Sequence, residues 1–207
     1  MPAPLIAKVD RLAANPGDIP GRFFDILPGL PGLEAAHFLV SPTPAAVPQQ
    51  GEQRVGVWLW RGREGMREGH AALADAMGHV GPPPMIEERV LDVVTVEGEA
   101  TGKAAVVVHL GPFPSAAHRE AHLANGPRVH RALQGMEGNR GVIVLADPAC
   151  RDLVVVHFWD AAPEADAVRA AIAALPVAPG FDASLLTDPS YVETFDVLRS
   201  IRPAVAA

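Results

Sequence analysis

The 207 residues carry 24 acidic and 17 basic side chains, which gives a formal charge of −7. The chain lacks the clustered Lys and Arg that binding to nucleic acid or to an anionic membrane requires. Apolar residues make up 49% of the chain and charged residues 20%, which is enough for packed cores. The single cysteine, Cys150, excludes an internal disulfide and favours a reducing, cytoplasmic location. No apolar run approaches the length of a membrane span.

The first half of the chain predicts four strands and two helices. Runs rich in Val, Ile and Thr are typical of strands, whereas runs rich in Ala, Glu, Arg and Leu favour helices. Short clusters of Pro and Gly separate these runs. We therefore expect strands over 4–12, 33–40, 53–60 and 87–97, and helices over 19–27 and 62–78.

The second half predicts the same elements in the same order. Strands are expected over 103–111, 141–146, 152–159 and 190–201, and helices over 115–136 and 163–175. Each half thus has the order strand, helix, strand, strand, helix, strand, which is the ferredoxin-like arrangement. We expect two domains, over 1–100 and 101–207.

Self-similarity between the halves supports this division. Each half contains a strand that ends in Trp and is followed at once by an Ala-rich helix, and the two tryptophans are Trp60 and Trp159. Two further pairs, Pro42 with Pro148 and Asp92 with Asp196, keep the same order with shifts of about 100 residues. The halves are therefore interpreted as tandem repeats.

The repeat also predicts how the halves pack. A ferredoxin-like unit carries both helices on one face of an antiparallel sheet and leaves the other face apolar. Two such faces can cover each other within one chain, as they do between two chains in a dimer. The expected fold class is α+β, a pseudo-dimeric α/β barrel, present as a monomer or a homodimer.

The chain resembles the antibiotic biosynthesis monooxygenase family of the dimeric α/β-barrel superfamily. The resemblance lies in the segments "VWLWRGREGM" and "VHFWDAAPEA", where a strand ends in Trp before a helix, and in "PGLEAAHFLVSP" and "GPPPMIEERVLDVV". It covers nearly the whole chain as two copies. It lies more in pattern than in invariant residues.

The resemblance implies a small-molecule enzyme. Some members of the family oxidise polycyclic phenols or anthrones with O₂ and no cofactor, in a pocket lined by the strand-terminal Trp, a Tyr and a basic residue. The corresponding residues here are Trp60 with His70 in the first copy and Trp159 in the second. The chain departs from the pattern at the Tyr position, which is occupied by Met66 and Ala165.

Histidines are concentrated in the second half. A helix over 115–136 places His118 and His122 on the face that also carries Val129 and Leu133, and leaves His130 outside that face, in solvent. In the strand over 152–159, His157 shares a side with Trp159. His109 would join them if the register of its strand agrees. The equivalent first-half helix has no His, so the second half is expected to carry the site.

These histidines favour acid/base chemistry, because an imidazole near neutral pH can remove a phenolic or α-carbonyl proton. The predicted catalytic residues are His118, His122 and His157, assisted by His109, and the predicted pocket residues are Trp159, Trp60, His70, Val129 and Leu133. The expected function is cofactor-independent oxygenation of an aromatic or polyketide-like molecule.

Several alternatives remain open at this point. The same chemistry without O₂ gives a cyclase or isomerase. His118 and His122 have a chelating spacing, and with His109 and His157 they could instead hold a metal. Haem binding and non-catalytic binding of a small molecule are further alternatives. No nucleotide-binding or flavin-binding motif occurs in the sequence.

Overall fold

The computed structural model describes residues 4–14, 21–42, 52–78, 85–149, 151–176 and 182–202. Cys150 lies outside these ranges. The chain divides into two compact units, the first formed by residues 1–93 and 196–207 and the second by residues 94–195. Among the described residues, none of the helices combines the length and the apolar character that crossing a membrane requires.

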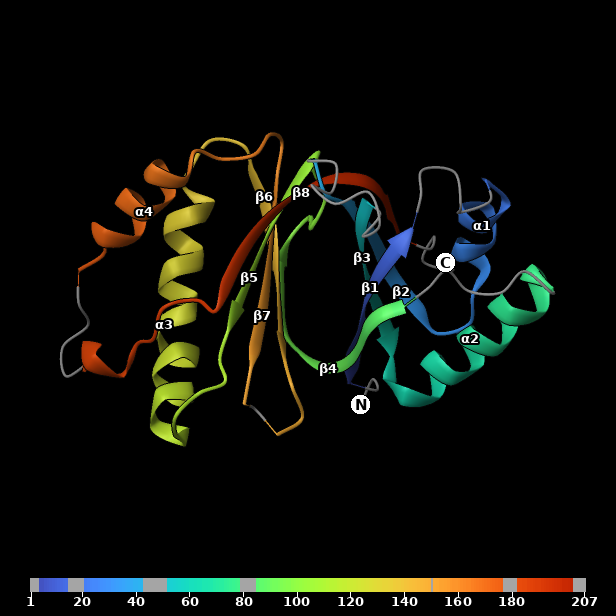
Figure 1. The fold of residues 1–207 in the computed structure, drawn as a ribbon, viewed down its shortest axis with the longest axis horizontal. Coiled ribbons are helices and arrows are strands. Elements are labelled where there is room, and N and C mark those ends of the chain that lie inside the picture. Colours follow the sequence, from blue (N-terminus) through green and yellow to red (C-terminus); the bar gives the residue numbers. More distant parts are fainter. Residues whose placement is uncertain are drawn as a thin grey trace. The chain divides into compact units, whose positions relative to one another are not determined.

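The first unit contains two helices and an antiparallel sheet. Its strands are hydrogen-bonded in the order β4-β1-β3-β2-β8. In Figure 1, α1 and α2 lie on the same side of β1, β2 and β3. The elements are β1 (Leu5–Ala14), α1 (Gly21–Ile26) with the short 3-10 helix η1 (Leu27–Gly29), β2 (Leu33–Val40), β3 (Glu52–Arg61), α2 (Gly62–Met77) and β4 (Met85–Gly98).

The second unit repeats this order of elements. Its strands are hydrogen-bonded in the order β8-β5-β7-β6-β4, and α3 lies along the sheet with α4 beside it (Figure 1). The elements are β5 (Ala104–Leu110), α3 (Ala116–Gln134), β6 (Asn139–Ala146), β7 (Leu153–Trp159), α4 (Ala165–Ala173), the 3-10 helix η3 (Ala183–Leu185) and β8 (Tyr191–Ile201).

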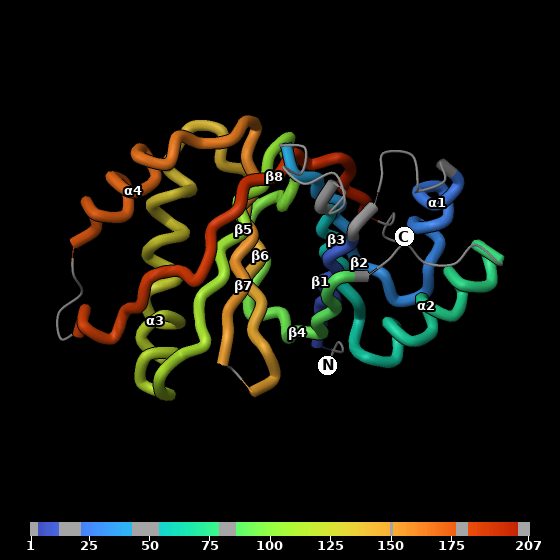
Figure 2. The backbone as a smooth tube through the Cα atoms, in the orientation of Figure 1, coloured from blue at the N-terminus to red at the C-terminus, as the bar shows by residue number. Residues whose placement is uncertain are grey.

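All predicted strands and helices are present, with ends that differ by a few residues. The fold class is therefore α+β, with two ferredoxin-like arrangements of antiparallel strands. The two compact units divide the chain within β4 and β8, so each of these strands contributes residues to both units. The course of the backbone can be followed in Figure 2. The expected domain boundary at residue 100 stays a prediction. The last part of β8 pairs with β2, where Val40 lies opposite Asp196.

Strand alternation separates each sheet into a helix-facing side and an opposite side. In the first unit, the helix-facing core is aromatic: Phe38, Trp58 and Trp60 pack with Phe23 and Phe24 of α1. In the second unit, the helix-facing core contains Trp159 and Leu133 of α3, with aliphatic side chains around them. The strand-terminal tryptophans thus occupy matching positions under the helices.

Glycines bring α2 close to the first sheet. A Cβ atom at Gly69 would lie 2.1 Å from the indole of Trp60 and 2.9 Å from the carbonyl oxygen of Pro31. A Cβ atom at Gly32, which has φ of 71°, would lie 2.5 Å from the backbone of Gly65. Only residues without a side chain permit these approaches, so Gly32, Gly65 and Gly69 set the distance between α2 and the sheet.

Replacing Gly69 with Ala is expected to lower the free energy of unfolding by about 1–3 kcal/mol, because the methyl group must displace the buried indole of Trp60. Gly126→Ala in α3 is the matched control, since its Cβ would meet nothing closer than 3.7 Å. That variant should be neutral or stabilised by up to about 1 kcal/mol. Urea unfolding measures both values, and equal effects would contradict the packing described here.

Candidate functional site

The structure separates the predicted histidines instead of gathering them. His118 lies at the exposed beginning of α3, where its Nδ1 atom is 2.8 Å from the hydroxyl oxygen of Ser115. The backbone N–H of Thr187 donates to Nε2 of His122 over 3.0 Å, and the Thr187 hydroxyl lies 3.2 Å from the same atom. Because Nε2 accepts a hydrogen bond from a backbone N–H, the His122 ring is neutral. His122 therefore holds the segment after η3 against α3.

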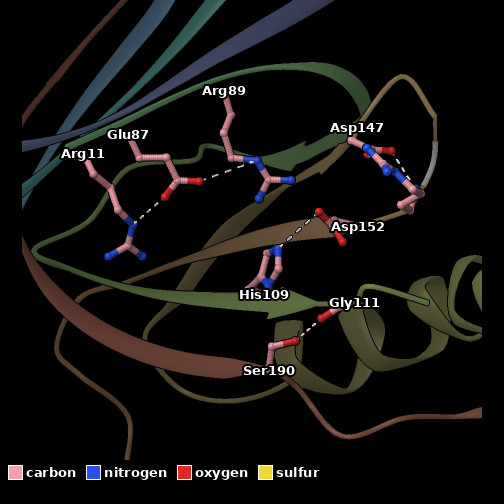
Figure 3. Close-up of polar contacts among 9 residues, drawn as sticks. Arg11, Glu87, Arg89, His109, Gly111, Asp147, Asp152 and Ser190 are labelled. Atoms are coloured by element: carbon pink, nitrogen blue, oxygen red, sulfur yellow. Dashed lines mark hydrogen bonds and ion pairs between the residues drawn. The ribbon is translucent and has the colours of Figure 1, made fainter. Parts of the chain in front are cut away.

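His109 lies on the side of the sheet that faces away from the helices. In the pairing of β5 with β7, Val106 is opposite His157 and His109 is opposite Val154. Since side chains alternate along a strand, His109 and His157 point to opposite sides. The register that would have brought them together is not the one observed. The His109 ring stacks on Tyr191 with centroids 4.7 Å apart, and its Nε2 atom lies 3.8 Å from a carboxylate oxygen of Asp152 (Figure 3).

His157 is instead joined by His130, which was expected in solvent. Both residues are 5% exposed, and their ring centroids are 5.2 Å apart. His157 lies on the helix-facing side of β7 together with Trp159, as predicted, with 6.5 Å between the two ring centroids. The expectation for His130 was wrong: His130 is one of the buried residues of α3, together with Ala121 and Leu133, and its ring packs against that of His157.

Burial keeps these two imidazoles neutral. Loss of solvation, together with the neighbouring His130, lowers the pKa of His157 to about 3. Burial also lowers the pKa of His130, while the charge of Glu97 acts in the opposite direction. The Nδ1 atoms of both rings have no hydrogen-bond partner among the described residues. The pair is thus a buried, uncharged group with unused polar atoms.

The first unit holds a charged group on its helix-facing side. Lys8 Nζ lies 3.4 Å from Oδ1 of Asp10 and 3.1 Å from Oε2 of Glu88. The register explains the grouping, because Asp10 is opposite both Gly56 on β3 and Glu88 on β4. The Lys8 and Asp10 side chains are nearly buried, whereas that of Glu88 is 45% exposed. The group therefore extends from the core to solvent.

Two indoles and an imidazole adjoin this charged group. Trp58 lies opposite Lys8, and its ring stacks on Trp60 with 6.1 Å between centroids and 11° between planes. The indole Nε1 of Trp58 lies over Gly56, within 2.7 Å of the point a Cβ would occupy. His70 of α2 meets Trp60 edge to face, with centroids 5.2 Å apart. Trp60 and His70, the pocket residues that the family resemblance implied, are thus in contact.

The surroundings shift the pKa of two of these groups. Burial raises the pKa of Asp10 to about 6, a change that Lys8 opposes and Glu88 adds to. Burial, followed by the positive charge of Lys8, lowers the pKa of half-buried His70, and Glu88 works against this. His70 is therefore an unprotonated imidazole at neutral pH, within the electrostatic influence of Lys8 and Glu88. The Asp10 carboxyl group, which lies near Lys8 Nζ, titrates near pH 6. Such a combination is typical of sites that transfer protons.

Sequence reasoning missed Lys8 and Asp10. The sequence showed no paired carboxylates, because Asp10 and Glu88 are far apart in the chain and come together only through the pairing of β1 with β4. A usable signal was present in "LIAKVDRL", where Lys8 and Asp10 share a side with the core residue Ile6. Two charges on the buried side of a strand need partners, and this could have indicated the group.

The opposite side of the first sheet carries a different charged group. Glu87 lies between Arg11 and Arg89, at 3.8 Å and 3.9 Å from their Nε atoms (Figure 3). The distances are at the long end for ion pairs and the Glu87 side chain is 45% exposed. We therefore regard this group as a contribution to the surface of β1 and β4 and give it no chemical role.

The alternative of a metal site formed by His109, His118, His122 and His157 does not agree with where these residues lie. His157 and His109 lie on opposite sides of the sheet, and His122 is bound to Thr187. Within the described ranges, no three His, Cys, Asp or Glu side chains are grouped so that they could hold a metal ion. Among these residues, the charged group around Lys8 and the pair of His130 with His157 are the two candidates for function.

Comparison with known proteins identifies the fold. No family model matches the chain, and no curated protein matches its sequence. Among solved structures, a Fusobacterium nucleatum protein named "putative monooxygenase" has a TM-score of 0.65 at 10% identity, over 98% of this chain and 96% of its own. An anthrone oxidase-like protein has a TM-score of 0.54 at 13% identity, over 96% and 93%.

A third neighbour carries a different name. A protein called "putative chlorite dismutase TA0507" has a TM-score of 0.58 at 9% identity, over 95% of this chain and 96% of its own. Monooxygenase-like and chlorite-dismutase-like proteins thus share this fold along nearly their whole length. At such low identities the likeness establishes the fold, and the chemistry has to be argued from the residues.

Acid is expected to destabilise the second unit through the histidine pair. The unfolded chain protonates these imidazoles below about pH 6.5, whereas folded His157 has a pKa of about 3. Between these values the unfolded state binds more protons, so the free energy of unfolding falls as the pH falls. When the pH is lowered from 7 to 4.5, the free energy of unfolding should fall by about 2–3 kcal/mol less in His157→Phe than in the wild type.

Urea unfolding at the two pH values measures this difference. The raised pKa of Asp10 acts in the opposite direction, but it is common to both proteins and cancels in the comparison. His118→Phe is the matched control, because His118 lies at the exposed start of α3, and it should keep the wild-type pH dependence. Equal acid sensitivity of His157→Phe and the wild type would contradict the buried neutral state.

Replacing His122 with Ala is expected to release the segment after η3. The Thr187 N–H loses its acceptor, which costs about 1–3 kcal/mol if the amide stays buried. Hydrogen exchange at the Thr187 amide should accelerate, whereas exchange in β7 should be unchanged. His118→Ala, which has no bond to Thr187, provides the control. An unchanged Thr187 exchange rate would show that His122 does not hold this segment.

Proposed function

We propose that the protein is a cofactor-independent oxygenase of an aromatic or polyketide-like small molecule, acting at the helix-facing charged group of the first unit. The observation that carries the proposal is that Lys8, held by Asp10 and Glu88, shares a side of the sheet with the stacked indoles of Trp58 and Trp60, while His70 packs against Trp60. The second unit was expected to hold the site. Among the described residues, the first unit brings a base, a cation and aromatic rings to one side of a sheet, and this favours it.

The proposed reaction begins with removal of a proton from an activated CH₂ group. The resulting carbanion reduces O₂ and combines with it to give a peroxide anion, which takes the proton back from the base. Loss of water from the hydroperoxide then leaves a carbonyl group. One CH₂ group and one O₂ give one C=O group and one water, so no external reductant is needed.

His70 supplies the base in this scheme. Its lowered pKa keeps the ring unprotonated at neutral pH, and its half-buried position on α2 leaves it within reach of a substrate. A positioned general base contributes about 10²–10⁴-fold to the rate of proton transfer. The His70 ring also packs edge to face with Trp60, and this contact fixes the orientation of the imidazole.

Lys8 supplies the positive charge that the reaction requires. Negative charge develops on the substrate oxygen and then on the peroxide, and a fixed ammonium group in a partly buried place stabilises both. Asp10 and Glu88 hold Lys8 Nζ from two sides. Asp10 acts as a positioning residue, and the ionisation of its carboxyl group near pH 6 determines how firmly Lys8 is held.

The aromatic residues favour a planar substrate. Trp58 and Trp60 lie nearly parallel, and Phe23 and Phe38 meet Trp58 edge to face. The two indoles are 7% and 0% exposed, so a flat, electron-rich molecule packs against them only where the half-buried His70 side chain gives way. The shared fold with an anthrone oxidase-like protein agrees with this class of substrate and directs the choice of a test compound.

Purified, chelator-treated protein should consume O₂ when supplied with anthrone, and should form no product without O₂. His70→Gln is expected to lower kcat by at least about 100-fold, because the base is lost. In Asp10→Asn, kcat should no longer change with pH around pH 6, because the carboxyl group that titrates there is lost. The variant should still turn over, because His70 is unchanged. An oxygen electrode and product absorbance measure the rates across pH 5 to 9.

His118→Gln is the matched control for His70→Gln, and Asp75→Asn, at an exposed position of α2, is the control for Asp10→Asn. Both controls should keep wild-type rates. Loss of turnover in His118→Gln but not in His70→Gln would show that the active site lies in the second unit and not in the first. Product formation from anthrone without O₂, or no O₂ uptake with anthrone or 1-naphthol, would overturn the oxygenase proposal.

A further inference from the structure

The pair of His130 and His157 contains more nitrogen donors than the protein uses. Each residue is 5% exposed, the rings are 5.2 Å apart, and each Nδ1 atom is buried without a hydrogen-bond partner among the described residues. Leaving a buried polar atom unpaired costs about 1–3 kcal/mol. Two such atoms on adjacent rings indicate a partner that both imidazoles can share.

The partner must be small. Trp159 and Leu133 are almost fully buried in the same core, with Val106 and Val129 packed against them. An organic molecule would have to displace several of these side chains, whereas a single ion between two rings needs little additional volume. The packing of these side chains therefore favours an ion over an organic ligand.

The donors select the kind of ion. Neutral imidazoles bind late transition metals through an unprotonated ring nitrogen. Zinc sites take four ligands, and no group of three or more His, Cys, Asp or Glu is present among the described residues. A site with two imidazole ligands instead suits Cu⁺, a closed-shell monovalent ion that accepts two nitrogen ligands and binds imidazole.

The surroundings suit one positive charge. Glu97 acts on His130 through its charge, and its carboxylate also accepts a hydrogen bond from Gln134 over 3.1 Å. One carboxylate balances one monovalent cation, which reduces the cost of burying the charge. The Trp159 ring, 6.5 Å from the His157 ring, and Met136, packed on the same core, add polarisable groups.

We propose that His130 and His157 form a binding site for Cu⁺ in the second unit, separate from the charged group of the first unit. The two ligands come from rigid elements, since His130 lies within α3 and His157 in the middle of β7, paired on both sides with β5 and β6. The site is therefore largely formed before the ion binds.

Anaerobic competition with bicinchoninate tests the site. The wild type should remove one equivalent of Cu⁺ from the coloured complex, and its thermal midpoint should rise. His157→Phe and His130→Phe should each lose at least 100-fold in affinity. Glu97→Gln, which leaves both imidazoles, should lose several-fold. X-ray absorption of the loaded protein should show nitrogen ligands.

His118→Ala is the matched control and should bind Cu⁺ as the wild type does. Circular dichroism checks that each Phe variant is folded, and His130→Gln and His157→Gln replace any that is not. No binding by the wild type, or full binding by both folded histidine variants, would overturn the proposal. The oxygenase assay uses chelator-treated protein and the His70 variant, so failure of one proposal leaves the other intact.

Discussion

The packing of a strand-terminal indole under a covering helix determines most of what each unit can do. Trp60 and Trp159 are almost completely buried, and the helix above each must fit around a large rigid ring. In the first unit the helix adapts through Gly69, which brings α2 down to the sheet and His70 against the indole. In the second, Leu133 covers the indole and His130 fills the space over Gly126.

The two units therefore share an arrangement and differ in chemistry. The first gathers opposite charges near solvent, where Lys8 lies between two carboxylates and a carboxyl group titrates near pH 6. The second has two uncharged imidazoles in an almost dry core. Burial favours the neutral form in both places, which is the protonated form of the Asp10 carboxyl group and the unprotonated form of the two imidazoles. Helices and strands in the same order thus surround two different electrostatic environments.

The sequence predicts the order and type of the elements because strand propensity, helix propensity and Pro/Gly clusters act locally. It also places His157 on the side of Trp159, since this needs only alternation along one strand. It does not predict the partners of His109 or His157, which depend on the pairing of β5 with β7. It misplaces His130, because a helical wheel describes one helix alone, whereas the contact of His130 with His157 joins α3 to β7. Contacts across strands, such as Asp10 with Glu88, require the register.

The sharing of β4 and β8 limits how the chain can be divided. The end of β8 supplies the hydrogen-bonding partner of β2, where Ala36 lies opposite Ile201. A fragment that stops at residue 100 would keep every helix of the first unit but would leave β2 as an open edge from Ala36 to Val40. An apolar edge of this kind pairs readily with other chains and promotes aggregation. The chain therefore cannot be cut at residue 100 without this loss, because β2 takes one of its two partner strands from the end of the chain.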